Sequence, residues 1–94
     1  MFNTTDHKEL LWRFSDGRTI SFPVGEWIRR GTSPVTIDSI EVDGTSATVL
    51  CDNGGVCLEI RHTILQDASV SQEIDVRFLR AMDDVLIDIR FRPD

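Results

Sequence analysis

Tight-turn dipeptides recur along this 94-residue chain and constrain its fold more than any other feature: Asp-Gly at 16–17 and 43–44, and Asn-Gly at 53–54. Between them, apolar and polar residues alternate with a period of two, as in strands that bury one face. We therefore predict an all-β fold of about seven antiparallel strands joined as a meander. The expected strands span residues 8–14, 18–24, 34–42, 45–52, 55–64, 69–80 and 84–92.

The register of each hairpin follows from the loop length that places apolar residues opposite apolar residues, because a slip by one residue turns a whole face outward. In the first hairpin, a three-residue loop at 15–17 satisfies this condition, with Gly17 in the left-handed conformation of a bulge. This loop pairs Trp12 with Ile20 and Leu10 with Phe22.

The second hairpin turns at 43–44, where a two-residue turn sets Ile40 opposite Ala47. Ile37, further upstream, has the opposite parity to Ile40. We therefore expect a bulge near 38–39, which returns Ile37 to the buried face.

Cys51 and Cys57 flank the third turn. A two-residue type I′ turn at 53–54 sets Cys51 opposite Val56 and keeps every inward pair apolar. A three-residue loop would oppose the two cysteines, but it would also place Glu59 against an apolar partner. The better register sends the two thiols to opposite faces, so we predict that they form no disulfide bond.

Apolar residues alternate through 69–80 and again through 84–92. A four-residue loop between these stretches pairs Phe78 with Ile87 and opposes unlike charges on the outer face, which favours pairing. The opposed charges are Glu73 with Arg92, Asp75 with Arg90 and Arg77 with Asp88. An α+β fold with a helix over 69–82 is the alternative, because the same residues also fit a four-residue apolar spacing.

A sheet with one apolar face must curl over itself or pack against another surface. We therefore expect a small closed or half-open β-barrel that forms a single domain over residues 1–94. Residues 1–7 are expected to be a loose N-terminus. Residues 25–31 are expected to form a turn or short helix that covers one end of the barrel.

Composition excludes several classes of partner. The chain has 16 acidic and 10 basic residues, a net charge of −6, so we expect no basic face for nucleic acid. The first residues lack the basic and apolar regions of a signal peptide, and no apolar run is long enough for a membrane span. We therefore expect a cytoplasmic protein with free thiols and no membrane partner.

No set of residues in the sequence predicts catalysis, a cofactor or a metal, so we expect a protein that is not an enzyme. His62 has inward parity and is expected in the core or at its rim, while Cys57 faces away from it, so a Cys-His nucleophile is not formed. One alternative stays open. The turn acids Asp16, Asp43 and Asp67 lie at one end of a meander, where converging carboxylates bind a divalent cation, although tight turns also select Asp for backbone reasons.

One group of residues predicts a surface for a protein partner. The expected registers place Leu50 beside Cys57, and Leu79 opposite Leu86, toward one end of the outer face. An apolar cluster that is rimmed by charges is typical of an interface. The alternative is that the 25–31 segment or the N-terminal residues cover this cluster.

Trp27, Arg29 and Arg30 form a second candidate group. If Trp27 is buried, it plugs the end of the barrel. If it is exposed, its combination with two arginines is the composition of a binding hot spot. The acids Asp83 and Asp84 are expected near the same arginines, which would make this end of the molecule a rim of mixed charge.

Three functions fit the sequence. The first is a non-enzymatic protein-interaction module, which acts through the apolar cluster and in which the partner is another protein or a second copy of the chain. The second is an acidic inhibitor of the immunity-protein type that blocks a basic site, whose binding would weaken steeply with salt. The third is a barrel that binds a small ligand, which would require a sizeable cavity.

Overall fold

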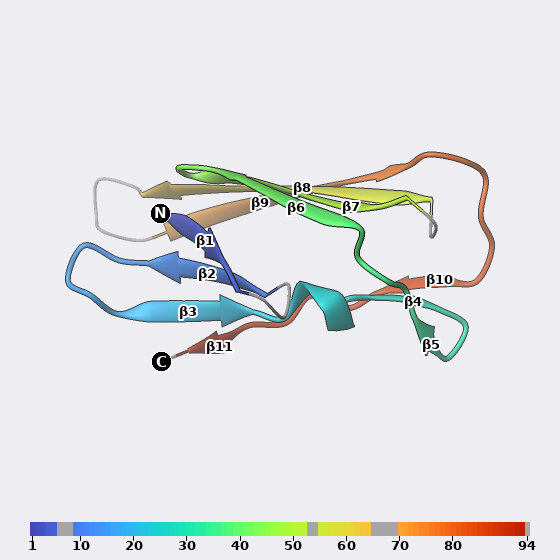
Figure 1. Ribbon diagram of the computed structural model, residues 1–94, viewed down its shortest axis with the longest axis horizontal. Helices are drawn as coiled ribbons and strands as arrows, with labels where there is room; N and C mark the ends of the chain where they lie inside the picture. Colours follow the sequence, from blue (N-terminus) through green and yellow to red (C-terminus); the bar gives the residue numbers. More distant parts are fainter. Residues whose placement is uncertain (6–8, 53–54, 65–69, 94) are drawn as a thin grey trace.

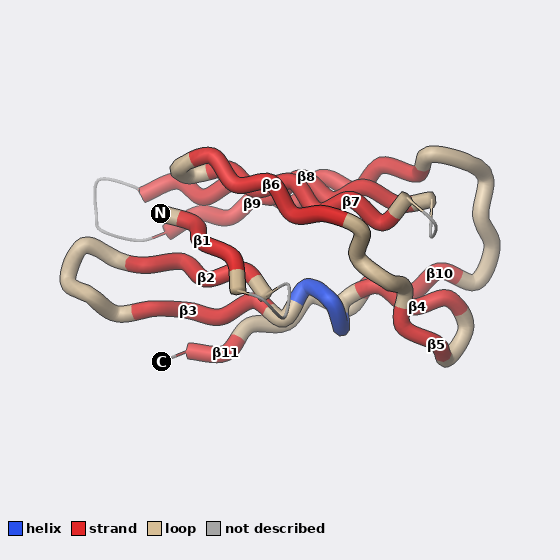
Figure 2. Tube along the Cα trace, viewed as in Figure 1, coloured by secondary structure: helices blue, strands red, loops and turns tan. Residues whose placement is uncertain are grey.

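The computed structural model describes residues 1–5, 9–52, 55–64 and 70–93, which are mostly β-structure (Figure 2). The strands in these residues are β1 (Phe2–Thr4), β2 (Leu10–Arg13), β3 (Thr19–Phe22), β4 (Ile28–Arg30), β5 (Ser33–Pro34), β6 (Ser39–Asp43), β7 (Ser46–Cys51), β8 (Val56–Ile64), β9 (Val70–Phe78), β10 (Val85–Ile87) and β11 (Arg92–Pro93), and a 3-10 helix, η1, spans Val24–Glu26. Every pairing is antiparallel, which confirms the all-β class. No helix in the described part of the chain is long and apolar enough to cross a membrane.

The strands form three sheets in two layers, not the closed barrel that was one of the expectations (Figure 1). One layer is the sheet β6-β7-β8-β9. The other layer contains the sheets β1-β2-β3-β11 and β10-β4-β5. At one side of the molecule, β1 lies beside β6. At the other side, one layer ends with β9, and the other layer ends with β10, residues 88–91 and β11, which follow one another along the chain. We call this side of the molecule the open side.

The first and third hairpins have the predicted registers. Trp12 lies opposite Ile20, and Gly17 has a φ of 93° in the left-handed region that only glycine adopts at little cost. Cys51 lies opposite Val56. The two central residues of the third turn lie outside the described residues, so its predicted type I′ conformation stays a prediction.

The predicted register of the second hairpin is wrong by two residues. Ile40 lies opposite Val49 instead of Ala47, because the turn is formed by Gly44 and Thr45. Gly44 has a φ of 57° and takes the first central position, where a type II′ turn requires glycine. A shift by two residues preserves the face of every side chain, so the predicted inward set of this hairpin is unaffected.

The backbone is irregular where the sequence predicts a bulge. The N–H group of Asp38 donates to the carbonyl of Leu50 at 2.8 Å, and Ser39 also lies opposite Leu50. Two residues therefore face one, and Ile37 is returned to the core, where its side chain is 4% exposed. The strand expected from residue 34 begins only at Ser39, because residues 35–38 carry the chain from one layer to the other.

Within the stretch for which a strand was predicted, β9 spans Val70–Phe78, so the strand is confirmed there and the alternative helix is wrong. The predicted hairpin with residues 84–92 is wrong. Ile87 lies opposite Ile28 in β4 and not opposite Phe78. After β9, the chain crosses to the other layer, where β10 and β11 pair with β4 and β3 (Figure 1).

The charge pairs that accompanied this hairpin are wrong as well. Arg61 binds Glu73 at 3.1 Å and Asp75 at 2.8 Å, and Arg90 binds Asp88 at 2.6 Å. Arg92 binds Glu9 and Glu26. Exposed ion pairs contribute less than about 1 kcal/mol each, so they adapt to a register that packing determines.

The core lies between the two layers and contains the inward residues of β7 and β8, which are almost completely buried. These are Ala47, Val49, Cys51, Val56, Leu58 and Ile60. The layer that contains β1, β2 and β3 contributes Phe2, Leu10, Trp12 and Phe22. Phe2 belongs to β1, so the expected loose N-terminus is wrong for Phe2–Thr4, which pair with β2.

Candidate functional site

β9 forms one edge of its sheet and differs from the other edges. It is nine residues long and pairs on one side with β8, and within the described residues no strand pairs with its other side. It contains no proline, glycine or lysine. Since natural proteins protect sheet edges with short strands, proline or lysine, the edge of β9 is open to another strand.

The hydrogen bonds of β9 show which of its backbone groups face the free edge. Leu79 donates its N–H to the carbonyl of Gly55 at 2.8 Å, which makes the neighbouring pair of Phe78 with Val56 a non-hydrogen-bonded pair. Because the two kinds of pair alternate along an antiparallel ladder, the same holds for Val76 and Ile74. The N–H and C=O groups of these three residues therefore point away from β8.

The side chains of the same residues are apolar, and two of them are exposed. Val76 is 39% exposed and Phe78 is 50% exposed, although their partners Leu58 and Val56 are completely buried. On the other layer, Ile89 and Phe91 are 49% and 61% exposed. We call Val76, Phe78, Ile89 and Phe91 the open-side residues.

The outer face of β9 carries charges. Arg61 holds Glu73 and Asp75 from the neighbouring strand. Arg77 makes no ion pair within 4.0 Å among the described residues, and it lines a shallow depression with Cys57. With respect to the residues that the structure describes, the guanidinium of Arg77 is therefore available on the outer face of β9 to bind a carboxylate.

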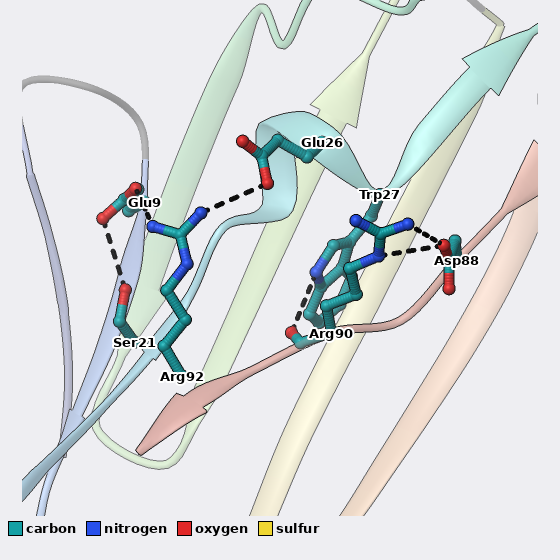
Figure 3. A network of polar contacts seen from close by, with 7 residues as sticks. All are labelled: Glu9, Ser21, Glu26, Trp27, Asp88, Arg90 and Arg92. Atoms are coloured by element: carbon teal, nitrogen blue, oxygen red, sulfur yellow. Dashed lines mark hydrogen bonds and ion pairs between the residues drawn. The ribbon is translucent and has the colours of Figure 1, made fainter. Parts of the chain in front are cut away.

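A network of polar contacts holds the segment that carries Ile89 and Phe91 (Figure 3). Trp27 donates its indole N–H to the carbonyl of Arg90 at 3.0 Å, and it accepts the N–H of Asp88 on its own carbonyl at 2.8 Å. Arg92 reaches Glu9 on one side and Glu26 on the other, at 3.7 and 3.4 Å. The open side is therefore bordered by a fixed segment.

The structure divides the apolar cluster predicted on the outer face. Leu50 lies opposite Cys57, as predicted, and both are partly buried. Leu79 follows β9 near the same end and is 48% exposed. Leu86 does not face Leu79: it lies opposite Arg29 in another sheet and is 56% exposed.

Trp27, Arg29 and Arg30 do not form an exposed hot spot. Trp27 is completely buried, and Ile28 beside it is 1% exposed, so these two residues belong to the core. The 25–31 segment forms the end of η1 and then β4, a strand within a sheet and not a cap over an open end. Arg29 is partly buried, and Arg30 lies 3.8 Å from Asp84 in an exposed ion pair, as expected for a rim of mixed charge.

His62 is a core residue, as expected from its parity. It is 6% exposed and stacks on Trp12 with 4.2 Å between ring centroids, while Phe2 and Phe22 contact it edge-on. Burial lowers the pKa of His62 to about 4, with a further lowering from the amino group of Met1. The imidazole is therefore neutral at pH 7.

Three buried polar atoms have no hydrogen-bond partner in the described part of the protein: the Nε1 atom of Trp12, the Nδ1 atom of His62 and the Nε2 atom of Gln72. His62 stacks on Trp12 and lies opposite Gln72 across β8 and β9. The three unpaired groups therefore belong to neighbouring residues beside an apolar core. Each unpaired group lowers the free energy of unfolding by about 1–3 kcal/mol.

The turn acids give no support to a cation site. No group of three metal-ligating side chains occurs within the described ranges. Asp16 accepts the backbone N–H and the guanidinium of Arg18, which lower the pKa of Asp16. The carboxylate of Asp16 therefore stabilises the hairpin turn in which it lies. Asp67 lies outside the described residues.

An open apolar groove of about 520 Å³ lies at the end of the molecule that holds the first two hairpin turns. The residues that line it are Met1, Trp12, Arg13, Phe14, Ser15, Gly44 and Thr45. No pattern in the sequence predicts this groove, because it forms where the N-terminal strand meets turns that are distant in sequence.

Comparison of the chain with protein-family models, with curated proteins and with solved structures found no match.

Proposed function

We propose that this chain is a non-enzymatic protein-interaction module that binds its partner as an additional strand along β9. The observation that carries the proposal is a nine-residue edge whose outward backbone groups belong to apolar residues, two of which are exposed. Strand addition uses such an edge: the main chain supplies affinity, and the alternate side chains supply specificity.

The other sheet edges are less suited to this role. β5 and β11 are two residues long, and each contains a proline. β1 and β10 have three residues each, and β6, with five, lies beside β1. Short strands and proline prevent strand addition, so β9 is the edge that a partner strand would use.

The open-side residues favour a partner with apolar side chains. Complete burial of a Val, Ile or Phe side chain contributes about 1.5–3 kcal/mol. The open-side residues are 39% to 61% exposed, so each retains a substantial part of this free energy for binding. An exposed apolar surface next to a free edge is typical of an interface.

The proposal is tested with Val76→Pro. The N–H of Val76 points away from β8, so proline removes a donor from the free edge without removing a bond of the β8–β9 ladder. Val42→Pro is the matched control. Val42 is 40% exposed on the opposite edge of the same sheet and lies next to the turn-flanking pair of Asp43 with Ser46, so its N–H also points off the sheet.

Affinity capture from a lysate of the source cells compares the two variants with the wild-type chain. We expect proteins that bind wild type and Val42→Pro to be lost with Val76→Pro. Leu79→Ser separates the edge from the outer-face cluster of Leu50, Cys57 and Leu79, and we expect it to keep the same proteins. Equal capture by Val76→Pro and wild type would refute the proposal.

The groove beside Trp12 and Phe14 favours a second candidate function, the binding of a flat apolar ligand. Its volume of about 520 Å³ lies within the usual range for small-molecule sites. Titration with the dye anilinonaphthalene sulfonate tests it. One-site binding that is lost with Phe14→Ser and kept with Val76→Pro would support a ligand site, and binding that follows Val76→Pro would assign the dye to the open side.

A further inference from the structure

We infer that the partner of β9 is a second copy of this chain, with β9 pairing antiparallel to β9 about a two-fold axis that passes through Val76. The inference rests on the proposed function and specifies it. The two four-stranded sheets would join into one continuous sheet of eight strands. The register follows from the order of charges and apolar residues along β9.

Symmetry restricts the possible registers. In an antiparallel pair, opposite residues point to the same face, so each residue must meet one of its own parity. A two-fold axis therefore passes through a residue that faces its own copy. Within β9, the charged positions are Glu73, Asp75 and Arg77, and they decide which residue this is.

Of the five axes from Glu73 to Arg77, four place like charges together. An axis at Glu73, Asp75 or Arg77 sets that residue against its own copy. An axis at Ile74 sets Glu73 against Asp75 of the second copy. Each of these registers opposes equal charges across the strands, which destabilises the pairing.

An axis at Val76 opposes only unlike charges on the outer face. Asp75 then faces Arg77 of the second copy, and Arg77 faces Asp75 of the second copy. On the inner face, Val76 meets Val76 and Ile74 meets Phe78, so every pair in the centre is apolar. The same register gives favourable pairs on both faces, as the registers of the observed hairpins do.

The backbone of β9 is oriented for this pairing. The N–H and C=O groups of Ile74, Val76 and Phe78 point to the free edge, as the hydrogen bond of Leu79 to Gly55 requires. In the proposed register, these residues form the hydrogen-bonded pairs. Arg77, which has no ion pair within 4.0 Å in the part of the chain that the structure describes, acquires one with Asp75 of the second copy.

The pairing also covers part of the open side. Val76 and Phe78, which are 39% and 50% exposed, would lie beside the apolar residues of the second strand. Ile89 and Phe91 lie on the edge of the other layer, next to the space that the second copy enters. The dimer would therefore cover apolar surface that a single copy exposes.

Disulfide trapping tests the register. In a Cys57→Ser background, Val76→Cys places a thiol on the two-fold axis, where the paired Cα atoms lie about 5.5 Å apart, a distance that a disulfide spans. Ile74→Cys is the matched control, on the same strand and face. Its thiol would face Phe78 of the second copy, and its own copy would lie four residues further along.

We expect oxidation to give covalent dimers with Val76→Cys and none with Ile74→Cys. Dimers with Ile74→Cys alone would contradict the register, and dimers with neither variant would contradict the pairing.

Charge exchange gives an independent test. Asp75→Arg opposes Arg77 with arginine, and Arg77→Asp opposes Asp75 with aspartate, so each variant alone should dimerise at least about tenfold more weakly than wild type. Mixed together, they form a heterodimer in which both pairs are again of opposite charge. Recovery of dimer on mixing is expected, and it also shows that both variants fold.

Sedimentation equilibrium of the purified chain separates this inference from the proposed function. We expect a monomer–dimer equilibrium for wild type and Val42→Pro and a monomer for Val76→Pro. A wild-type chain that stays monomeric while Val76→Pro loses proteins in the capture experiment would refute the self-pairing and leave the proposed function intact.

Discussion

His62 lies between the two layers with aromatic rings on three of its sides. Trp12 stacks on it in parallel, and Phe2 and Phe22 meet its edges. Charging the imidazole in this apolar environment is unfavourable, so the pKa of His62 falls to about 4. A residue that resembles a catalytic or ligand-binding histidine in the sequence is therefore a neutral part of the core.

The low pKa of His62 predicts a loss of stability in acid. Between pH 6.5, its ordinary pKa, and pH 4, the unfolded chain binds a proton that the folded chain excludes. The contribution of His62 to the free energy of unfolding is therefore fully present above pH 6.5 and falls by about 3 kcal/mol as the pH approaches 4. Urea denaturation across this range measures the change.

His62→Phe is the control, because a phenyl ring fits among the surrounding rings and does not titrate. The carboxylates titrate equally in both proteins, so the difference between their curves isolates the imidazole. Parallel loss of stability in wild type and His62→Phe over this range would contradict the buried neutral histidine.

The two cysteines differ in exposure, and this predicts their reactivity. Cys51 is completely buried, whereas Cys57 is partly buried on the opposite face. We expect one thiol per chain to react with a labelling reagent in the native state and the second only after unfolding. Loss of the native reaction in Cys57→Ser checks the assignment, and equal reactivity of the two thiols would contradict the register.

At the scale of elements, the sequence was sufficient wherever a tight turn and the apolar alternation agreed. The first and third hairpins are examples, because each has one loop that opposes apolar residues throughout. The second hairpin shows the limit: Asp43–Gly44 and Gly44–Thr45 turns both keep the faces apolar, so alternation alone cannot separate them. Turn chemistry does not separate them either, because Asp-Gly suits a type I′ turn and Gly-Thr suits a type II′ turn.

The segment 85–93 could not be placed from its own pattern. Its apolar residues alternate correctly for pairing with β9, but they alternate equally well for pairing with β4 and β3. The choice depends on which edge lacks a partner, and this is known only after the two layers have formed. Charged residues do not distinguish the two pairings, because exposed arginines form ion pairs with acidic residues in either arrangement.

Gly55 packs against the segment that follows β9, which leads to a prediction for two glycines. Gly55 has a φ of 71°, and a Cβ atom there would lie 2.9 Å from the Nε atom of Arg80 and 3.0 Å from the Sδ atom of Met82. Gly17 has a φ of 93°, but a Cβ atom there would meet nothing within 4 Å.

We expect Gly17→Ala to cost about 1–2 kcal/mol for its backbone conformation alone. Gly55→Ala should cost more, because the neighbouring side chains must also move. Thermal unfolding of both variants measures the difference. A smaller loss for Gly55→Ala than for Gly17→Ala would contradict this packing.

For the whole molecule, the main feature is the open side, and the sequence could not locate it. Val76 and Phe78 have the same inward parity as Leu58 and Val56, yet the former are exposed and the latter are buried. Parity indicates which face a residue occupies, but not whether the opposite layer extends far enough to cover it. The sequence feature that indicates an accessible edge is the absence of proline and lysine from β9, combined with the position of this strand at the edge of its sheet.

The net charge of −6 bears on how binding depends on salt. Arg61, Arg90 and Arg92 are each paired with acids, so the charges are partly balanced locally. We expect dimerisation through β9 to depend only weakly on ionic strength, because it combines backbone bonds and apolar contacts with two exposed charge pairs. Sedimentation at low and high salt checks this, and a steep loss with salt would indicate binding dominated by charge.

Amide hydrogen exchange of β9 at several protein concentrations tests the central claim most directly. The N–H groups of Asp75 and Arg77 bond to β8 and should be protected at every concentration. The N–H groups of Ile74, Val76 and Phe78 point to the free edge, so they should exchange rapidly in dilute solution and become protected as the concentration rises. Exchange of these three amides that does not change with concentration would contradict the pairing of β9 with a second copy.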